Sequence, residues 1–117
     1  MTKPLSPRVH GALDYATVAA FALAPSALGL VGLAAALSYG LALVHLLMTL
    51  ATAFPLGAVA LVPFRVHGAV EAAVGVGLVV LGLLLFRDVA FVFFLGAGAA
   101  ILAVWALTDY GRPPDRA

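Results

Sequence analysis

The chain has 117 residues, of which 65% are hydrophobic and only 9% carry a charge. A water-soluble domain is closer to half apolar and a quarter charged, so this composition indicates an integral membrane protein and excludes a disordered or nucleic-acid-binding chain. Cysteine is absent, which excludes disulfides, thiolate chemistry and cysteine-ligated zinc or iron–sulfur sites.

Four segments are long and apolar enough to cross a bilayer, which takes roughly 20 residues. In chain order, we expect helices over residues 9–24, 34–54, 63–86 and 89–107. Ser6 and Pro7 are typical of a helix start. Pro25 is expected to break the first helix and Pro55 to end the second. Because the first helix is short for a full span, the apolar stretch at 25–33 is expected to complete the crossing.

Positive charges predict the orientation of the chain. The side of the loop between the last two helices has only Arg87, whereas the side of the termini has five cations: Lys3, Arg8, Arg65, Arg112 and Arg116. The positive-inside rule therefore predicts a multi-pass inner-membrane protein with both termini in the cytoplasm. We expect the N-terminal segment to be a retained span and not a cleaved signal peptide, because it carries histidine and aspartate.

A seven-residue motif occurs twice, 57 residues apart, as RVHGALD at 8–14 and RVHGAVE at 65–71. The second helices match more weakly at an offset of 56, which aligns Thr52 with Thr108. We therefore expect one all-α domain over residues 1–117, a four-helix bundle of two tandem helical hairpins at about 8–57 and 65–112. Hairpins of equal orientation should be related by a pseudo-two-fold axis along the membrane normal, which would place both motifs at the same depth.

Three features together resemble the SPW-repeat family: the two-hairpin repeat, the Ala24-Pro25-Ser26 turn, and Arg87-Asp88 ahead of a glycine-rich helix that ends in Trp105. Members of that family are small bacterial membrane proteins with two helices per repeat and no established activity. The resemblance implies a membrane location and assigns no catalytic residues.

Each copy of the motif pairs a histidine with a carboxylate four residues later: His10 with Asp14, and His67 with Glu71. Residues at this spacing share one helix face. An acidic side chain at the membrane edge is unfavourable by up to a few kcal/mol, so both should face protein or water. We rank a local hydrogen bond that fixes hairpin packing first, ahead of a proton or cation relay and of a metal site with two ligands per helix.

A third histidine, His45, lies near the middle of the second predicted helix and hence near the bilayer midplane. It shares a polar stripe with Ser38, Thr49 and Thr52, whereas its partner in the second repeat is Ile101. Hydrogen-bonded packing is the favoured interpretation of His45, and contact with a pore, a ligand or a haem is the alternative.

Small residues predict where helices pack closely, and we expect this role for Gly68, Gly75, Gly82, Gly96 and Ala100. Residues expected at the membrane interface are Arg8, Arg65, Trp105 and Tyr110, with the two arginines pairing across the repeat axis in the structural interpretation. The small-residue faces favour a homo-oligomer, of which a dimer is the simplest.

The leading hypothesis for function is a non-enzymatic integral membrane protein that acts as a structural or interaction subunit. The alternatives are a small oligomeric proton or ion channel or transporter, and a metal- or haem-binding membrane protein. We assign no catalytic residue and no cofactor. The expected partners are the lipid bilayer, a second copy of the chain and other membrane proteins, with no nucleic acid.

Overall fold

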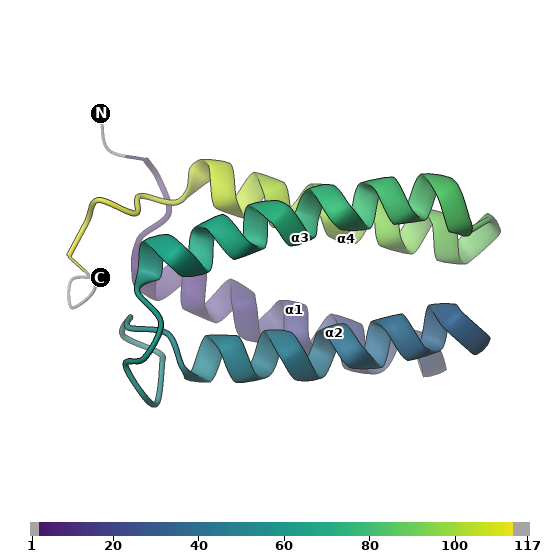
Figure 1. Ribbon diagram of the computed structural model, residues 1–117, viewed down its shortest axis with the longest axis horizontal. Helices are drawn as coiled ribbons and strands as arrows, with labels where there is room; N and C mark the ends of the chain where they lie inside the picture. Colours follow the sequence, from purple (N-terminus) through teal and green to yellow (C-terminus); the bar gives the residue numbers. More distant parts are fainter. Residues whose placement is uncertain (1–2, 114–117) are drawn as a thin grey trace.

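The computed structural model describes residues 3–113 as a bundle of four long helices (Figure 1). They are α1 (Pro7–Leu28), α2 (Gly32–Leu50), α3 (Phe64–Leu85) and α4 (Asp88–Leu107). All four are long and apolar enough to cross a membrane. Consecutive helices pack as hairpins, α1 with α2 and α3 with α4, which confirms the predicted all-helical bundle. Arg116, counted above for orientation, lies outside the described residues.

The two hairpins form two layers, and the starts of α1 and α3 lie at the same end as the ends of α2 and α4 (Figure 1). The opposite half of the bundle is held by an apolar core that includes Phe21, Leu78 and Phe94. Across the layers, the rings of Phe21 and Phe93 meet edge to face with centroids 5.8 Å apart. Apolar packing therefore joins the hairpins at one end, whereas the other end combines aromatic rings, such as Phe54 and Phe64 with centroids 5.5 Å apart, with buried polar groups.

The first helix continues through Pro25 to Leu28, so the predicted break at this proline is wrong. Proline has no backbone N–H to donate to the carbonyl four residues earlier, which is that of Phe21. The hydroxyl of Ser38 on α2 donates to this carbonyl instead, at 2.7 Å. The helix ends at Gly29, whose φ of 67° is favourable for glycine and unfavourable for other residues. With 22 residues, α1 is long enough for a full span.

The second helix ends at Leu50, four residues before its predicted end at Phe54. The chain leaves the helix because the next residues pair with the segment that precedes α3. The N–H of Ala53 donates to the carbonyl of Val62, and the N–H of Val62 donates to the carbonyl of Ala51, both at 2.8 Å. This two-bond bridge ties the end of α2 to the start of α3.

The same bridge recurs between the two ends of the described chain. The N–H of Leu5 donates to the carbonyl of Leu107 at 3.1 Å, and the N–H of Asp109 donates to the carbonyl of Leu5 at 2.9 Å. Leu5 corresponds to Val62 at the offset of 57, and Leu107 corresponds to Ala51 at the offset of 56. The second bridge ties the start of α1 to the end of α4 and so joins the hairpins at this end.

The α3–α4 hairpin packs through glycines of α3, as predicted from their spacing. A Cβ atom at Gly75 would lie 2.7 Å from Leu102, and one at Gly82 would lie 2.8 Å from Leu95. Both distances are too short for a carbon–carbon contact, so the backbone of α3 approaches α4 as closely as it does only because these side chains are absent.

Two residues of α4 that were predicted to pack against another helix or another subunit, Gly96 and Ala100, are exposed within this chain. They line a shallow apolar groove beside α1. The close approach of α4 to α3 is made by Gly98, which lies on a different face of α4. A Cβ atom added at Gly98 would lie 2.8 Å from the carbonyl oxygen of Gly75. A stripe of alternating small residues does not indicate which of its two faces meets the partner helix.

Candidate metal centre

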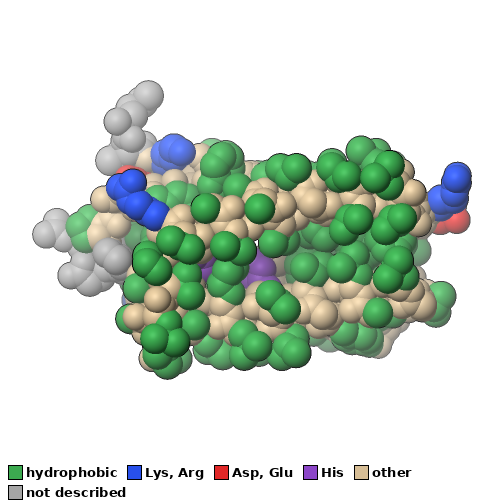
Figure 2. All heavy atoms as spheres, viewed as in Figure 1, with side chains coloured by type: hydrophobic (Ala, Val, Ile, Leu, Met, Phe, Trp, Pro, Cys, Tyr) green, Lys and Arg blue, Asp and Glu red, His purple; other side chains and the backbone are tan. Residues whose placement is uncertain are grey.

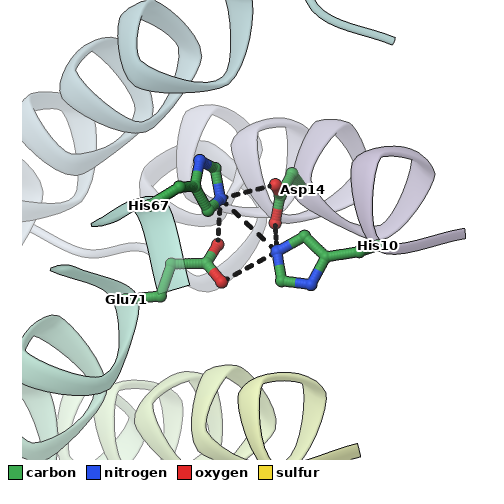
Figure 3. A group of neighbouring side chains, drawn as sticks. All are labelled: His10, Asp14, His67 and Glu71. Carbon is green, nitrogen blue, oxygen red and sulfur yellow. Dashed lines mark hydrogen bonds and ion pairs between the residues drawn. The ribbon is translucent and has the colours of Figure 1, made fainter. Parts of the chain in front are cut away.

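The two copies of the motif meet at the interface between the hairpins, in the first turns of α1 and α3 (Figure 3). The start of α1 is fixed by Ser6, whose hydroxyl accepts a hydrogen bond from the N–H of Val9 at 3.2 Å. Both helices begin at the same end of the bundle, so motifs placed equally along them face each other. The four residues are no more than 2% exposed; they are His10, Asp14, His67 and Glu71.

Each histidine contacts the carboxylate of its own helix and that of the other helix. The Nε2 atom of His10 lies 3.3 Å from Asp14 Oδ1 and 2.9 Å from Glu71 Oε2. The Nε2 atom of His67 lies 3.1 Å from Glu71 Oε1 and 2.9 Å from Asp14 Oδ2. One ligand atom from each of the four residues can be chosen so that all lie within 4.8 Å of one another. The cluster is therefore a single compact site shared by the two hairpins.

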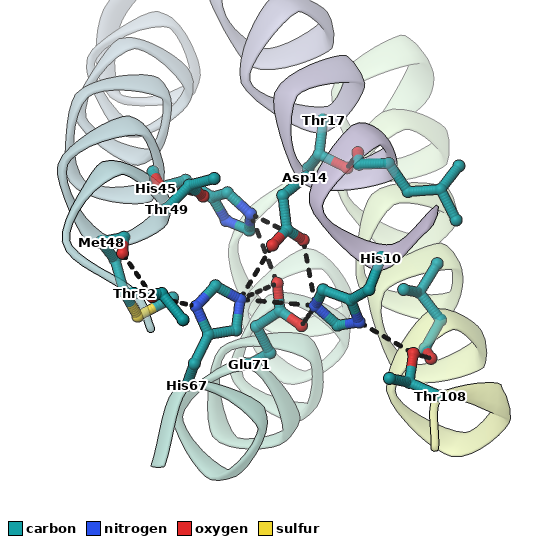
Figure 4. A network of polar contacts seen from close by, with 12 residues as sticks. His10, Asp14, Thr17, His45, Met48, Thr49, Thr52, His67, Glu71 and Thr108 are labelled. Atoms are coloured by element: carbon teal, nitrogen blue, oxygen red, sulfur yellow. Dashed lines mark hydrogen bonds and ion pairs between the residues drawn. The ribbon is translucent and has the colours of Figure 1, made fainter. Parts of the chain in front are cut away.

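The other ring nitrogen of each histidine is held by a threonine of the opposite hairpin (Figure 4). His10 Nδ1 lies 2.8 Å from Thr108 Oγ1, and His67 Nδ1 lies 2.7 Å from Thr52 Oγ1. The two threonines, like the two histidines, occupy matching positions in the repeats. Each histidine is thus anchored at its outer nitrogen and presents its inner nitrogen to the cluster.

The threonine hydroxyls determine which nitrogen carries the proton. Thr108 donates its hydroxyl proton to the carbonyl of Val104 at 2.5 Å, and Thr52 donates to that of Met48 at 2.6 Å. A hydroxyl has one proton, so toward the histidine it acts as an acceptor. The Nδ1 atoms therefore carry protons and donate to the threonines. In a neutral imidazole this leaves Nε2 as a lone pair that points into the cluster.

Four electron-pair donors thus converge in a buried space: two Nε2 atoms, which are 3.4 Å apart, and two carboxylates. Asp14 Oδ2 makes no hydrogen bond within the described residues, although it is buried. Arg8 and Arg65 are exposed, and neither forms an ion pair with Asp14 or Glu71 in the described part of the chain. The predicted arginine pairing therefore does not neutralise the cluster. Two buried carboxylates without a cation are strongly unfavourable.

His45 of α2 lies beside this cluster, although the repeat does not include it. Its Nε2 atom is 3.5 Å from Asp14 Oδ1 and 3.4 Å from Glu71 Oε1. Because α2 ends at Leu50, His45 is about 7.5 Å from that end of the helix, at 1.5 Å per residue, and not at the predicted centre of the helix. The structure therefore brings all three histidines and both carboxylates together.

Tyr110, predicted to be an interfacial anchor, forms a wall of the site. A Cβ atom at Gly68 would lie 2.5 Å from its ring, and the ring centroid is 5.7 Å from that of His10 and 4.7 Å from that of Phe64. Burial raises the pKa of the Tyr110 phenol, and the nearby carboxylate of Glu71 raises it further. The phenol therefore stays neutral. Trp105, in contrast, is 40% exposed.

The sequence did not reveal the part played by Thr52 and Thr108. Both were recognised as aligned positions, and Thr52 as part of a polar stripe, but neither was matched to a histidine. Matching threonines near the ends of two hairpins, in a chain with matching histidines near their starts, are a signal that they belong to one site.

Comparisons of this chain with family models, curated proteins and solved structures gave no match. The chemistry of the cluster is therefore inferred from its donor atoms. Imidazole nitrogens suit zinc, iron, nickel and copper, and carboxylate oxygens extend the choice to manganese. At a metal–ligand distance of about 2.0–2.2 Å, tetrahedral ligand atoms lie about 3.3–3.6 Å apart. The contacts between histidine and carboxylate, at 2.9–3.3 Å, are close to this size.

Proposed function

We propose that this membrane protein holds one divalent transition-metal ion, of the Zn²⁺, Fe²⁺ or Mn²⁺ type, between its two hairpins. The ligands are Nε2 of His10 and His67 and one oxygen each of Asp14 and Glu71. The observation that carries the proposal is the pair of Nε2 atoms, 3.4 Å apart, whose Nδ1 protons are directed outward to threonines. Two lone pairs at this distance repel each other unless a cation lies between them.

A divalent ion accounts for more of the geometry than hydrogen bonding alone. Its charge balances the two carboxylates, and its coordination uses the two imidazole nitrogens and Asp14 Oδ2, which has no hydrogen bond in the described chain. The alternative, a proton on each Nε2 atom, also balances the two carboxylates but places two imidazolium cations next to each other. Outer hydrogen bonds that orient metal-bound histidines are the usual companions of such sites, and the two threonines supply them.

The coordination also favours a non-enzymatic role. Metal sites that act in catalysis keep a position open for water or substrate, whereas four protein ligands close the shell. The ion would join residues of both hairpins at the end of the bundle where the buried polar groups lie. We therefore propose that it stabilises the bundle or is held there for storage or transfer.

The location of the site in the cell follows from the charge distribution. With both termini in the cytoplasm, as the positive-inside rule predicts, the cluster lies near the cytoplasmic surface of the inner membrane. The repeated bridges and the repeated histidine–threonine contacts support a pseudo-two-fold relation between the hairpins. A homodimer stays the simplest oligomer for the exposed small residues of α4.

Metal analysis of the purified protein tests the proposal. The chain in detergent is stripped with a chelator, dialysed against Zn²⁺, Mn²⁺ or Fe²⁺ (without oxygen for iron), and analysed for metal per chain. We expect one ion per wild-type chain. The double variant His10→Ala/His67→Ala should lose more affinity than the roughly 10–100-fold that is typical of removing an outer hydrogen bond.

The matched control is Asp88→Asn, which removes a carboxylate at the opposite end of the bundle and should leave the metal content unchanged. Circular dichroism and gel filtration establish that each variant is folded. A folded wild-type protein that retains none of these ions would contradict the proposal and return the cluster to a role in packing. Equal metal content in the double variant would contradict the ligand assignment.

A further inference from the structure

His45 differs from the other two histidines in how it is held. His10 and His67 are fully buried and anchored at Nδ1, whereas His45 is 5% exposed and its Nε2 atom has no hydrogen bond within the described residues. In the aligned position of the second hairpin stands Ile101, which is part of the apolar core. One side of the cluster therefore carries an additional metal-ligating group that the duplicated scaffold does not require.

The two carboxylate oxygens nearest to His45 are shared with the inner histidines. Asp14 Oδ1 lies 3.5 Å from His45 Nε2 and 3.3 Å from His10 Nε2. Glu71 Oε1 lies 3.4 Å from His45 Nε2 and 3.1 Å from His67 Nε2. His45 and these two oxygens thus form a second set of three ligand atoms next to the first set (Figure 4).

The two sets serve one ion at a time. Two carboxylates balance the charge of one divalent ion, and a second ion would leave two positive charges uncompensated in a buried, low-dielectric space. Among the described residues, the carboxylates that contact the histidines are those of Asp14 and Glu71. The outer set, on the side of His45, and the inner set, on the side of His10 and His67, are therefore alternative positions that share two oxygens.

The outer position faces the opening of the site. In the space-filling view, histidine side chains are visible at the bottom of a gap between α2 and α3 (Figure 2). His45, on α2, is the histidine of the cluster with measurable exposure, since His10 and His67 are 0% exposed. It lies about 7.5 Å from the end of α2, nearer to this end of the bundle than to the opposite end.

We propose that His45 is the entry ligand of the metal centre: an aqueous divalent ion binds first to His45 and the two shared oxygens, and then moves inward to His10 and His67. The carboxylates hold the ion throughout this transfer, so it is never without a counter-charge. This inference rests on the proposed metal-binding function and adds the route by which the ion is exchanged.

The test is the rate of metal exchange. Association of Zn²⁺ with the stripped protein in detergent, and its release to an excess of a coloured chelator, are followed by stopped flow for the wild type and for His45→Gln and His45→Leu. We expect both rates to fall by about ten-fold or more, with one ion bound per chain and an equilibrium dissociation constant changed much less than either rate. The matched control, Ile101→Leu, alters the aligned position of the other hairpin and should leave both rates unchanged.

Unchanged rates in both folded His45 variants would overturn the proposal. A lower affinity that arises from faster release alone, at an unchanged association rate, would make His45 an ordinary fifth ligand and would also overturn the proposal. Two ions per wild-type chain, falling to one in the variants, would replace alternative positions by a dinuclear centre. A wild-type chain that binds no Zn²⁺, Mn²⁺ or Fe²⁺ would instead overturn the proposed function itself.

Discussion

The two hairpins share the contacts that build the cluster and differ in those that surround it. In both, a histidine is anchored by a threonine of the other hairpin. In both, a residue ahead of the first helix, Leu5 or Val62, forms two backbone hydrogen bonds with the segment at the end of the other hairpin's second helix. The differences are at aligned positions: His45 against Ile101, and Phe54 against Tyr110. The shared contacts make one cluster from two halves, and the differences place a third histidine on the α2 side and an isoleucine of the apolar core on the α4 side.

The largest effect that would sharpen this comparison is expected at the paired motif glycines. A Cβ atom at Gly68 would lie 2.5 Å from the Tyr110 ring, whereas one at Gly11 would lie 3.0 Å from the Phe54 ring. Over-packing costs about 1–3 kcal/mol, so we expect Gly68→Ala to lower the free energy of unfolding by about 3 kcal/mol and Gly11→Ala by about 1 kcal/mol. Thermal and denaturant unfolding in detergent measure both.

The control for these substitutions is Gly77→Ala on α3, because a Cβ atom there meets open space among the described residues. It should leave stability unchanged or raise it, since alanine is the better helix former by roughly 1 kcal/mol. Equal losses at Gly11 and Gly68 would show that the aromatic walls of the two hairpins are packed alike, against the asymmetry inferred from the distances.

The next effect concerns the threonines, where the hairpins should behave alike. Thr52→Val and Thr108→Val each keep the side-chain shape and remove the acceptor for a histidine Nδ1–H. We expect each to weaken metal binding about 10–100-fold, which is about 1.4–2.7 kcal/mol. Equilibrium competition with a chelator measures the dissociation constants.

Thr49→Val is the matched control, because Thr49 is equally buried and also donates to a carbonyl one turn earlier, that of His45, without contacting a ring nitrogen of the cluster. Its affinity should equal that of the wild type. A loss confined to one of the two anchoring threonines would mean that only one histidine is a ligand and would break the equivalence of the hairpins.

The smallest effect tests a contact that only the first hairpin has. Ser38→Ala removes the donor to the Phe21 carbonyl and should cost about 1 kcal/mol of unfolding free energy, the usual value of one hydrogen bond. In a Pro25→Ala background, the alanine N–H can donate to the same carbonyl, so the cost of Ser38→Ala should disappear. A double-mutant cycle by thermal unfolding checks this, and equal costs in both backgrounds would rule out the compensation.

Hydropathy and the repeated motif predicted the four spans, the hairpin pairing and the residues of the cluster. They did so because each of these depends on sequence within one helix or on a simple offset. The end of α1 was mispredicted because the compensation for Pro25 comes from Ser38, a residue of another helix. The end of α2 was mispredicted because it depends on pairing with Val62, which a helix signal does not report.

The remaining features of the site depend on how three helices are rotated and shifted against one another. His45 reaches Asp14 and Glu71 only when α2 lies against α1 at one particular axial shift. The alignment of the two repeats indicated that His45 is not part of the duplicated site, because the aligned residue is an isoleucine. Tyr110 follows α4 and was interpreted as an interfacial anchor. Its ring lies over Gly68 only because α3 and α4 approach each other closely in the folded hairpin, and the sequence of either helix alone does not report this.

The anchoring hydrogen bonds cross from one hairpin to the other: Thr108 of the second holds His10 of the first, and Thr52 of the first holds His67 of the second. The histidine and the threonine of a single hairpin therefore do not bind each other. Each needs the threonine or the histidine of a second hairpin as its partner. An ancestor of half this length would therefore form these anchoring pairs only as a dimer. Duplication and fusion of its gene would make that assembly intramolecular and free each copy to change separately, as at His45 and Ile101.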